Sequence, residues 1–154
     1  MPDGILGVDE LFEIAGSTEM FLDIGDDGAA SAVFAALERH LNANVWLVHS
    51  SLEVLADWRQ ESERVRLVHA DRLRRLDGGA ERHAANLRDR SIDALAMHQS
   101  DWSAGLTTLM HRFGRLALAT DADHVRIATV LLDDGVDAVM GPHVERLVDA
   151  ASAR

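Results

Sequence analysis

Three histidines stand at the ends of apolar segments that we expect to be parallel strands. His49, His69 and His98 close the segments 45–49, 65–69 and 92–98. The carboxyl ends of parallel strands meet on one face, where the active sites of such folds lie, so we expect these imidazoles to converge. Asp23, Asp26 and Asp121 follow other expected strands and join the same face. Imidazoles and carboxylates that converge suit a divalent ion or a phosphate group.

A different interpretation of these residues requires no ligand. Strand-end histidines often cap loops by hydrogen-bonding backbone carbonyls. Ser50 can contact a phosphate, but Ser50 and Glu53 also fit a capping box that opens a helix. The residue types of a nucleophilic triad are present in Ser50, His98 and Asp121, but no glycine-x-serine-x-glycine motif supports such a triad. Both interpretations of the histidines and of Ser50 stay open at this level.

Strand-like and helix-like segments alternate along the whole chain. Apolar runs predict strands at 19–24, 45–49, 65–69, 92–98, 114–120 and 136–140. Segments with helical spacing follow them, and a further short helix is expected at 8–15. We therefore expect a single α/β domain over 1–154, an incomplete TIM barrel of about six βα units with a parallel sheet. A closed barrel typically needs about 250 residues. An open doubly wound sheet is the alternative arrangement.

Composition excludes several classes of partner. The net charge of −11 argues against nucleic acid and anionic membranes, and no apolar run is long enough to span a membrane. Cysteine and lysine are absent, which removes disulfides, Schiff-base chemistry and the phosphate loop that requires lysine. We expect a cytoplasmic protein. Nine arginines within 59–90 form either a solvated, salt-bridged face or an anion site.

Four short motifs resemble the glycerophosphodiester phosphodiesterase family, whose members are metal-dependent TIM-barrel hydrolases. Gly135-Val-Asp-Ala-Val139 is similar to the run on the family's last strand, and Ser50-Ser51 to its serine signature after the fourth strand. Segments 7–12 and 21–26 resemble the entry to the third strand and that strand itself. The resemblance covers the family's third to eighth strands, so the first two βα units have no counterpart here.

The resemblance implies a small-molecule phosphodiester as ligand and a divalent metal, Mg²⁺ or Ca²⁺, if the protein is active. If the site is rebuilt at the strand ends, we expect His98 and His49 to be the catalytic residues. The other assigned positions are the metal ligands Asp23 and Asp26 and the substrate contacts Ser50, His69 and Asp121.

Other positions depart from the family pattern. The family's glutamate-x-lysine falls at Asp23 and Gly25, and its tryptophan after the seventh strand falls at Ala119. Its histidine-arginine pair and its glutamate and aspartate on the second strand have no counterpart.

These departures favour a phosphodiesterase-like domain of glycerophospholipid metabolism that is catalytically impaired. One alternative is an active enzyme whose site is rebuilt at the strand ends or across a dimer. Another is a non-catalytic binding or interaction module. In every case six strands leave the barrel open on one side, and we expect a homodimer that covers it.

Overall fold

The computed structural model describes residues 6–152, apart from the side chain of Asp27. The chain divides into two compact units, one up to Leu67 and one from Val68 onward. None of the helices in the described range is long and apolar enough to cross a bilayer.

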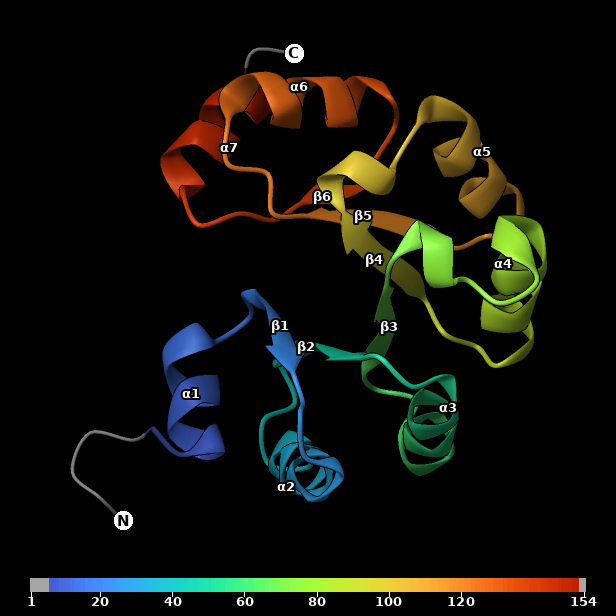
Figure 1. The fold of residues 1–154 in the computed structure, drawn as a ribbon. Helices are drawn as coiled ribbons and strands as arrows, with labels where there is room; N and C mark the ends of the chain where they lie inside the picture. The colour runs from blue at the N-terminus through green and yellow to red at the C-terminus, as the bar shows by residue number, and fades with distance from the viewer. Residues whose placement is uncertain (1–5, 153–154) are drawn as a thin grey trace. The chain divides into compact units, whose positions relative to one another are not determined.

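The first unit contains three helices and two strands (Figure 1): α1 (Val8–Ala15), β1 (Glu19–Asp23), α2 (Asp27–Leu37), β2 (Asn44–His49) and α3 (Leu52–Glu61). The second begins within β3 and contains β3 (Arg66–Asp71), η1 (Leu73–Arg75), α4 (Gly79–Asp89), β4 (Ala94–His98), η2 (Gln99–Asp101), α5 (Ala104–Arg112), β5 (Leu116–Thr120), α6 (Val125–Asp133), β6 (Ala138–Val139) and α7 (Val144–Ser152).

The strands are parallel and their order follows the sequence. The order is β1-β2-β3-β4-β5-β6, and every pair whose register is resolved runs parallel. A doubly wound sheet would reverse its order at a switch point, whereas sequential order is that of a TIM barrel. The predicted fold class, an incomplete TIM barrel with six parallel strands, is therefore confirmed.

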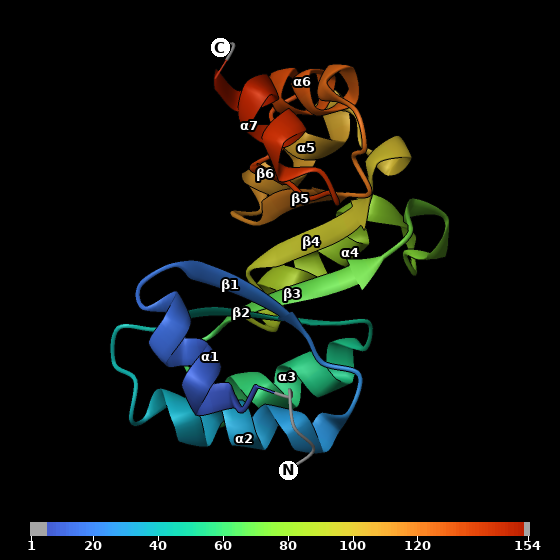
Figure 2. The same ribbon diagram turned by 90° about the vertical axis from the view of Figure 1, so that its left-hand side faces the viewer.

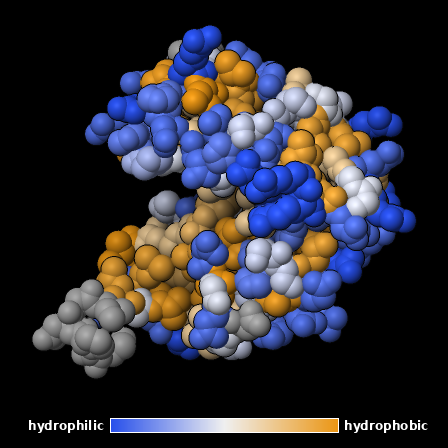
Figure 3. Space-filling model, in the orientation of Figure 1, coloured by the Kyte–Doolittle hydropathy of each residue, from blue (hydrophilic) through white to orange (hydrophobic). Residues whose placement is uncertain are grey.

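In the first unit, α2 and α3 lie on the same side of β1 and β2 (Figures 1 and 2). Val45, Trp46 and Leu47 are buried in succession on β2, as expected for a parallel strand that is covered on both faces. β1 is less buried, and apolar residues gather on the surface over α1 and β1 (Figure 3). Among the described residues β1 pairs with β2 alone, so its other edge is free.

In the second unit, α4, α5 and α6 lie on one side of the strands β3 to β6 (Figure 1). The stretch from Ala94 to Met97 on β4 is buried on both faces. Trp102 donates its indole N–H to the carbonyl of Leu118 on β5 at 3.0 Å, which fixes the segment between β4 and α5 against the sheet. Within the described range β6 pairs with β5 alone, so the second unit also has a free edge.

Several predicted element ends need correction. β3 continues to Asp71, two residues beyond the predicted end at His69. β6 has only two residues, Ala138 and Val139, instead of the predicted 136–140. α2 ends at Leu37, so apolar Leu41 lies outside the helix and is 76% exposed.

The predicted cap of α3 is also different. Ser51, not Ser50, caps α3, and its hydroxyl accepts the N–H of Val54 at 3.3 Å. α6 begins after His124 without a side-chain cap.

A close backbone contact at Gly141 gives a testable prediction. A Cβ at this position would lie 2.4 Å from the carbonyl oxygen of Ala122, far inside van der Waals contact. We expect Gly141→Ala to lower the free energy of unfolding by about 1–3 kcal/mol, because backbone must move. Gly105→Ala is the matched control, since nothing lies within 4 Å of its Cβ. Equal urea midpoints for the two variants would contradict the contact.

Candidate functional site

A cavity of about 220 Å³ lies in the second unit, at the carboxyl ends of β3, β4 and β5. This is the end of the strands at which parallel βα folds carry their active sites. Its residues come from the three strands and from the segments that follow them: Ala70, Asp71, Arg72, Arg75, Ala96, Met97, His98, Thr120 and Asp121. Small apolar side chains therefore share this cavity with two guanidinium groups, one imidazole and two carboxylates.

Arg72 is held by Asp101, which lies after β4. Its Nε donates to Asp101 Oδ2 at 2.6 Å and its Nη2 to Oδ1 at 3.2 Å. The N–H of Leu73 also donates to Asp101 Oδ2 at 3.2 Å. These bonds hold the pKa of Asp101 below its usual range, the hydrogen bond from Arg72 being the largest cause. The pair therefore stays ionised and fixes the first residue after β3.

Arg75 is oriented by Asp71 within the same loop. Its Nε donates to Asp71 Oδ1 at 2.7 Å, and the N–H of Arg72 donates to the same oxygen at 2.8 Å. Nη1 and Nη2 of Arg75 and Nη1 of Arg72 make no hydrogen bond within the described residues. Both guanidinium groups thus have unused N–H donors beside the cavity.

His98 ends β4 and takes part in the turn that follows. Its Nδ1 accepts the N–H of Ser100 at 3.2 Å, and the Ser100 hydroxyl lies 2.8 Å from the same nitrogen. Since Nδ1 acts as the acceptor, the hydrogen of the neutral ring is on Nε2. His98 therefore caps a loop, through a backbone N–H and not the expected carbonyl, and lies beside the cavity; its role toward a ligand stays a prediction.

Asp121 lies on the same rim, directly after β5. Its backbone adopts a left-handed conformation, with φ of 61°. The hydroxyl of Thr120 donates to its Oδ2 at 2.7 Å. The structure thus brings together two of the predicted site residues, His98 and Asp121, in one cavity.

His69 does not line this cavity. Because β3 continues to Asp71, His69 lies inside the strand and is 3% exposed. Its Nδ1 is 3.2 Å from Nε2 of His83 on α4, which is equally buried. Alternate residues of a strand face opposite sides, so Ala70 lines the cavity while His69 faces the helix. Its predicted position at a strand end was wrong.

The remaining predicted residues belong to the first unit. Asp23 is the exposed last residue of β1, and Asp26 caps α2 by accepting the N–H of Gly28 at 3.0 Å. Nδ1 of His49 accepts the N–H of Ser51 at 3.0 Å, and its ring packs edge-on against Trp58. Exposed Ser50 lies between these two bonded residues. His49 and His98 thus stabilise similar turns, and the roles assigned to these side chains stay predictions.

The residues present do not fit a divalent ion. No group of three or more histidine, aspartate or glutamate side chains within residues 6–152 is placed to hold a metal. One oxygen of Asp26 is used by the helix cap, and those of Asp71 and Asp121 accept hydrogen bonds from neighbouring donors. Hard cations need several convergent oxygens, and the described part of the chain does not bring them together.

Arg72 and Arg75 are the cavity residues that the sequence interpretation did not single out. Both belong to the arginine-rich stretch that was interpreted either as a salt-bridged face or as an anion site. The missed signal was the end of β3: once the strand reaches Asp71, Arg72 is the first residue after it. Residues in that position line the carboxyl-end face of a parallel fold.

The fold and the position of the cavity define the class of this protein as a TIM-barrel-type α/β protein, and solved structures agree. The chain matches no protein-family model and no curated protein. It is similar to a Silicibacter pomeroyi DSS-3 protein assigned as a glycerophosphoryl diester phosphodiesterase, with a TM-score of 0.79 and 14% identity over 94% of this chain and 55% of that one.

A phosphodiesterase from Oleispira antarctica, solved with the product sn-glycerol-3-phosphate, gives a TM-score of 0.76 at 16% identity, over 94% of this chain and 60% of that one. QR15, an aldolase, gives 0.67 at 11% identity, over 96% and 78%. The chain spans 55–63% of the length of the Silicibacter and Oleispira proteins and of two further proteins assigned as glycerophosphodiester phosphodiesterases. At these identities the likeness shows a shared fold.

Proposed function

We propose that this chain is a glycerophosphodiesterase-like domain that binds a small phosphodiester at the carboxyl ends of β3 to β5 and hydrolyses it slowly or not at all. The observation that carries the proposal is the set of unused donors on Arg72, Arg75 and His98 around one cavity. Guanidinium groups that are already oriented by carboxylates suit phosphate oxygens, because their planar donors are fixed before the ligand binds. The fold supports the same ligand class.

The charge of the cavity favours a diester over a monoester. Arg72 and Arg75 lie beside the carboxylates of Asp71, Asp101 and Asp121, so positive charge is largely balanced. A phosphodiester has a single negative charge, whereas a phosphomonoester has close to two at neutral pH. The second charge would be repelled by Asp121, which lies on the rim without a cation bonded to it in the described structure.

Slow or absent turnover follows from the chemistry that hydrolysis of this kind requires. A metal-dependent phosphodiesterase needs an ion that neutralises the phosphate and an acid/base pair that moves protons. The described side chains supply an imidazole and two guanidinium groups beside the cavity but no convergent ligands for an ion. The alternative is an active enzyme whose site is completed across a dimer, and metal-dependent hydrolysis of a diester would distinguish it.

Arg75→Gln tests the binding site. Arg75 offers two unused guanidinium nitrogens, so we expect its loss to weaken binding of glycerophosphoglycerol, a singly charged diester, about tenfold. Isothermal titration or chemical-shift changes at Arg75 and His98 give the affinity, and sn-glycerol-3-phosphate should bind more weakly than the diester. Arg74→Gln removes the same charge from the neighbouring exposed residue and should leave affinity unchanged. Equal affinities of Arg75→Gln and Arg74→Gln for glycerophosphoglycerol would contradict binding of the diester at this cavity.

The free edges of β1 and β6 support a proposal about partners. Each edge exposes backbone N–H and C=O groups that a second chain can pair or cover, so we propose that the protein forms a homodimer. A place in glycerophospholipid metabolism and a cytoplasmic location are proposed with it. Light scattering after size exclusion gives the mass of the assembly directly.

A further inference from the structure

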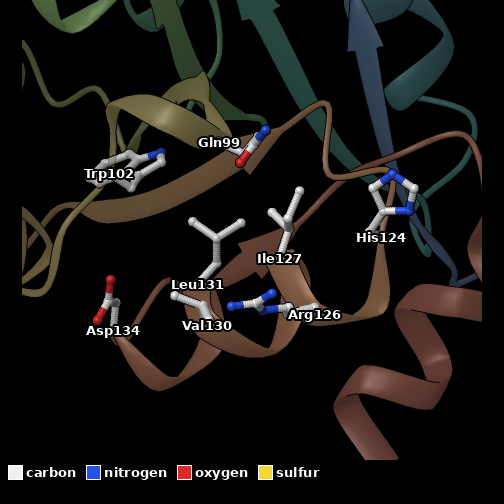
Figure 4. Close-up of a pocket in the computed structure, with 8 residues that line it drawn as sticks. All are labelled: Gln99, Trp102, His124, Arg126, Ile127, Val130, Leu131 and Asp134. Carbon is white, nitrogen blue, oxygen red and sulfur yellow. The ribbon is translucent and has the colours of Figure 1, made fainter.

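A second and larger pocket lies between α6 and the segment from η2 to Trp102 (Figure 4). Its volume of about 620 Å³ falls within the range of small-molecule sites. Ile127, Val130 and Leu131 project into it from α6, and Trp102 lies on the opposite side (Figure 4). The pocket lies within the second unit and shares no lining residue with the phosphodiester cavity.

The apolar wall of this pocket combines the nearly buried side chains of Trp102, 8% exposed, and Leu131 with the exposed side chain of Val130. Trp102 uses its indole N–H on the Leu118 carbonyl, so the ring offers the pocket apolar surface in a fixed position. Leu131 is 4% exposed and anchors α6 to the core, whereas neighbouring Val130 is 53% exposed. An apolar body of a ligand would remove this surface from water, which is the main favourable contribution in such pockets.

Opposite charges flank the apolar wall. Arg126 stands in the first turn of α6 and Asp134 directly follows its last turn. Neither has an ion-pair partner among residues 6–152. Their backbone positions are eight apart in the sequence, which corresponds to about 12 Å along a helix axis. The Arg126 side chain extends toward Val130 and Asp134 lies beyond Val130 (Figure 4), so the pocket presents a cation and an anion along one apolar stripe.

Both charges stand where they oppose the helix dipole. The N-terminus of a helix favours negative side chains and its C-terminus favours positive ones. α6 has no acidic residue in its first turn and no basic residue in its last. Arg126 and Asp134 thus do not help the helix to form, and both remain available to pair with a charged ligand.

We propose that this pocket binds a small zwitterion whose anionic group pairs with Arg126, whose cationic group pairs with Asp134, and whose apolar body packs on Trp102, Ile127 and Val130. Gln99 and His124 also line the pocket and offer hydrogen-bonding groups. The site takes a ligand with one charge at each end of an apolar body.

Three probes of equal chain length test this proposal in the intact protein: 8-aminooctanoate, octanoate and octylamine. Binding is followed by the indole N–H resonance of Trp102, assigned with Trp102→Phe. We expect 8-aminooctanoate to bind at least about tenfold more tightly than either singly charged probe. Octanoate binding as tightly as the zwitterion, or no shift of the Trp102 resonance with any probe, would overturn the proposal.

Substitutions separate a binding role from a structural one. Arg126→Gln should reduce affinity for the zwitterion to that of octylamine, and Asp134→Asn to that of octanoate. Neither should lower the melting temperature, because each removes a charge that opposes the helix dipole. Arg112→Gln, an exposed arginine on α5, is the control that leaves affinity unchanged. Retained affinity in either pocket variant, or a lower melting temperature than the control, would overturn the assignment.

The double variant Arg126→Asp/Asp134→Arg exchanges the two charges. We expect it to bind 8-aminooctanoate with an affinity close to that of the original protein, since the ligand can bind in the opposite direction. It should also melt at a higher temperature, because each new charge suits its end of α6. Failure to restore binding in this folded variant would contradict pairing at both ends.

Discussion

Between pH 6.5 and pH 4 we expect the protein to lose roughly 3 kcal/mol of unfolding free energy through the buried pair of His69 and His83. Burial lowers the pKa of His83 from 6.5 to about 4, with the neighbouring His69 adding to the effect. Asp71 and Asp77 oppose the shift but do not cancel it. Each tenfold change in proton affinity corresponds to about 1.4 kcal/mol, so a pKa lowered from 6.5 to about 4 gives the stated loss.

The sign follows from which state binds the proton. The unfolded chain protonates His83 near pH 6.5, whereas the folded protein resists protonation until about pH 4. Acid therefore favours the unfolded state throughout this window, and the contribution of His83 is fully present only above pH 6.5. Two buried rings 3.2 Å apart can share one hydrogen but cannot both be charged.

Urea unfolding at half-unit intervals from pH 4 to pH 7.5 measures this dependence. His83→Gln keeps a side-chain donor on α4 but removes the titrating ring, so it should flatten the slope between pH 4 and pH 6.5. His124→Gln is the control, because His124 is exposed before α6 and should retain the original slope. A slope that persists unchanged in His83→Gln would mean that another group controls acid unfolding.

Asp101→Asn should give the second large effect, because Asp101 joins two loops around the phosphodiester cavity. It accepts hydrogen bonds from Arg72 Nε, Arg72 Nη2 and the N–H of Leu73. The asparagine side chain keeps the shape but turns one acceptor into a donor that faces the guanidinium. We expect a loss of about 1–3 kcal/mol in unfolding free energy, the range for hydrogen bonds to charged groups.

Asp101→Asn should also weaken ligand binding, since Asp101 orients Arg72 without lining the cavity itself. We expect about tenfold weaker binding of glycerophosphoglycerol by folded Asp101→Asn. Asp89→Asn is the matched control, because its ion pair with Arg88 is exposed at 3.5 Å and contributes little. If Asp101→Asn, like the control, has unchanged stability and affinity, the bonds between Arg72 and Asp101 are not needed for folding or for ligand binding.

Strand interiors could be predicted from the sequence because apolar runs have a simple physical cause. The segments that became β2 and β4 are continuous apolar runs, and both are buried on two faces. Gly16 after α1 and Gly135 after α6 adopt positive φ, a conformation that glycine tolerates and that ends both helices.

Strand ends and side-chain directions were harder to predict. β3 continues to Asp71 because its backbone stays paired with β4, Ala70 opposite Ala96 and Asp71 opposite Met97. A strand buried on both faces gives no alternation that shows which residues face the helices, so His69 was placed on the wrong side. The partner that explains its burial, His83, lies 14 residues away on α4.

Part of the candidate site could be predicted and part could not. His98 and Asp121 were placed on the correct rim because each directly follows an apolar strand. Arg72 and Arg75 were not distinguished from the other arginines between 59 and 90, since spacing along the sequence does not show which carboxylate holds which guanidinium. The bond from Arg72 to Asp101 joins residues 29 apart, and only the fold brings them together.

The most direct test of the proposed function compares binding and turnover in one preparation. Purified protein is titrated with glycerophosphoglycerol, then incubated with glycerophosphocholine and with an aryl phosphodiester, with Mg²⁺ or Ca²⁺ and with chelator. We expect the protein to bind the diester and Arg75→Gln to weaken this binding. We expect neither Mg²⁺ nor Ca²⁺ to raise hydrolysis appreciably above the uncatalysed rate. Metal-dependent hydrolysis that chelator abolishes and His98→Ala removes in folded protein would contradict this expectation, and would establish an active phosphodiesterase instead.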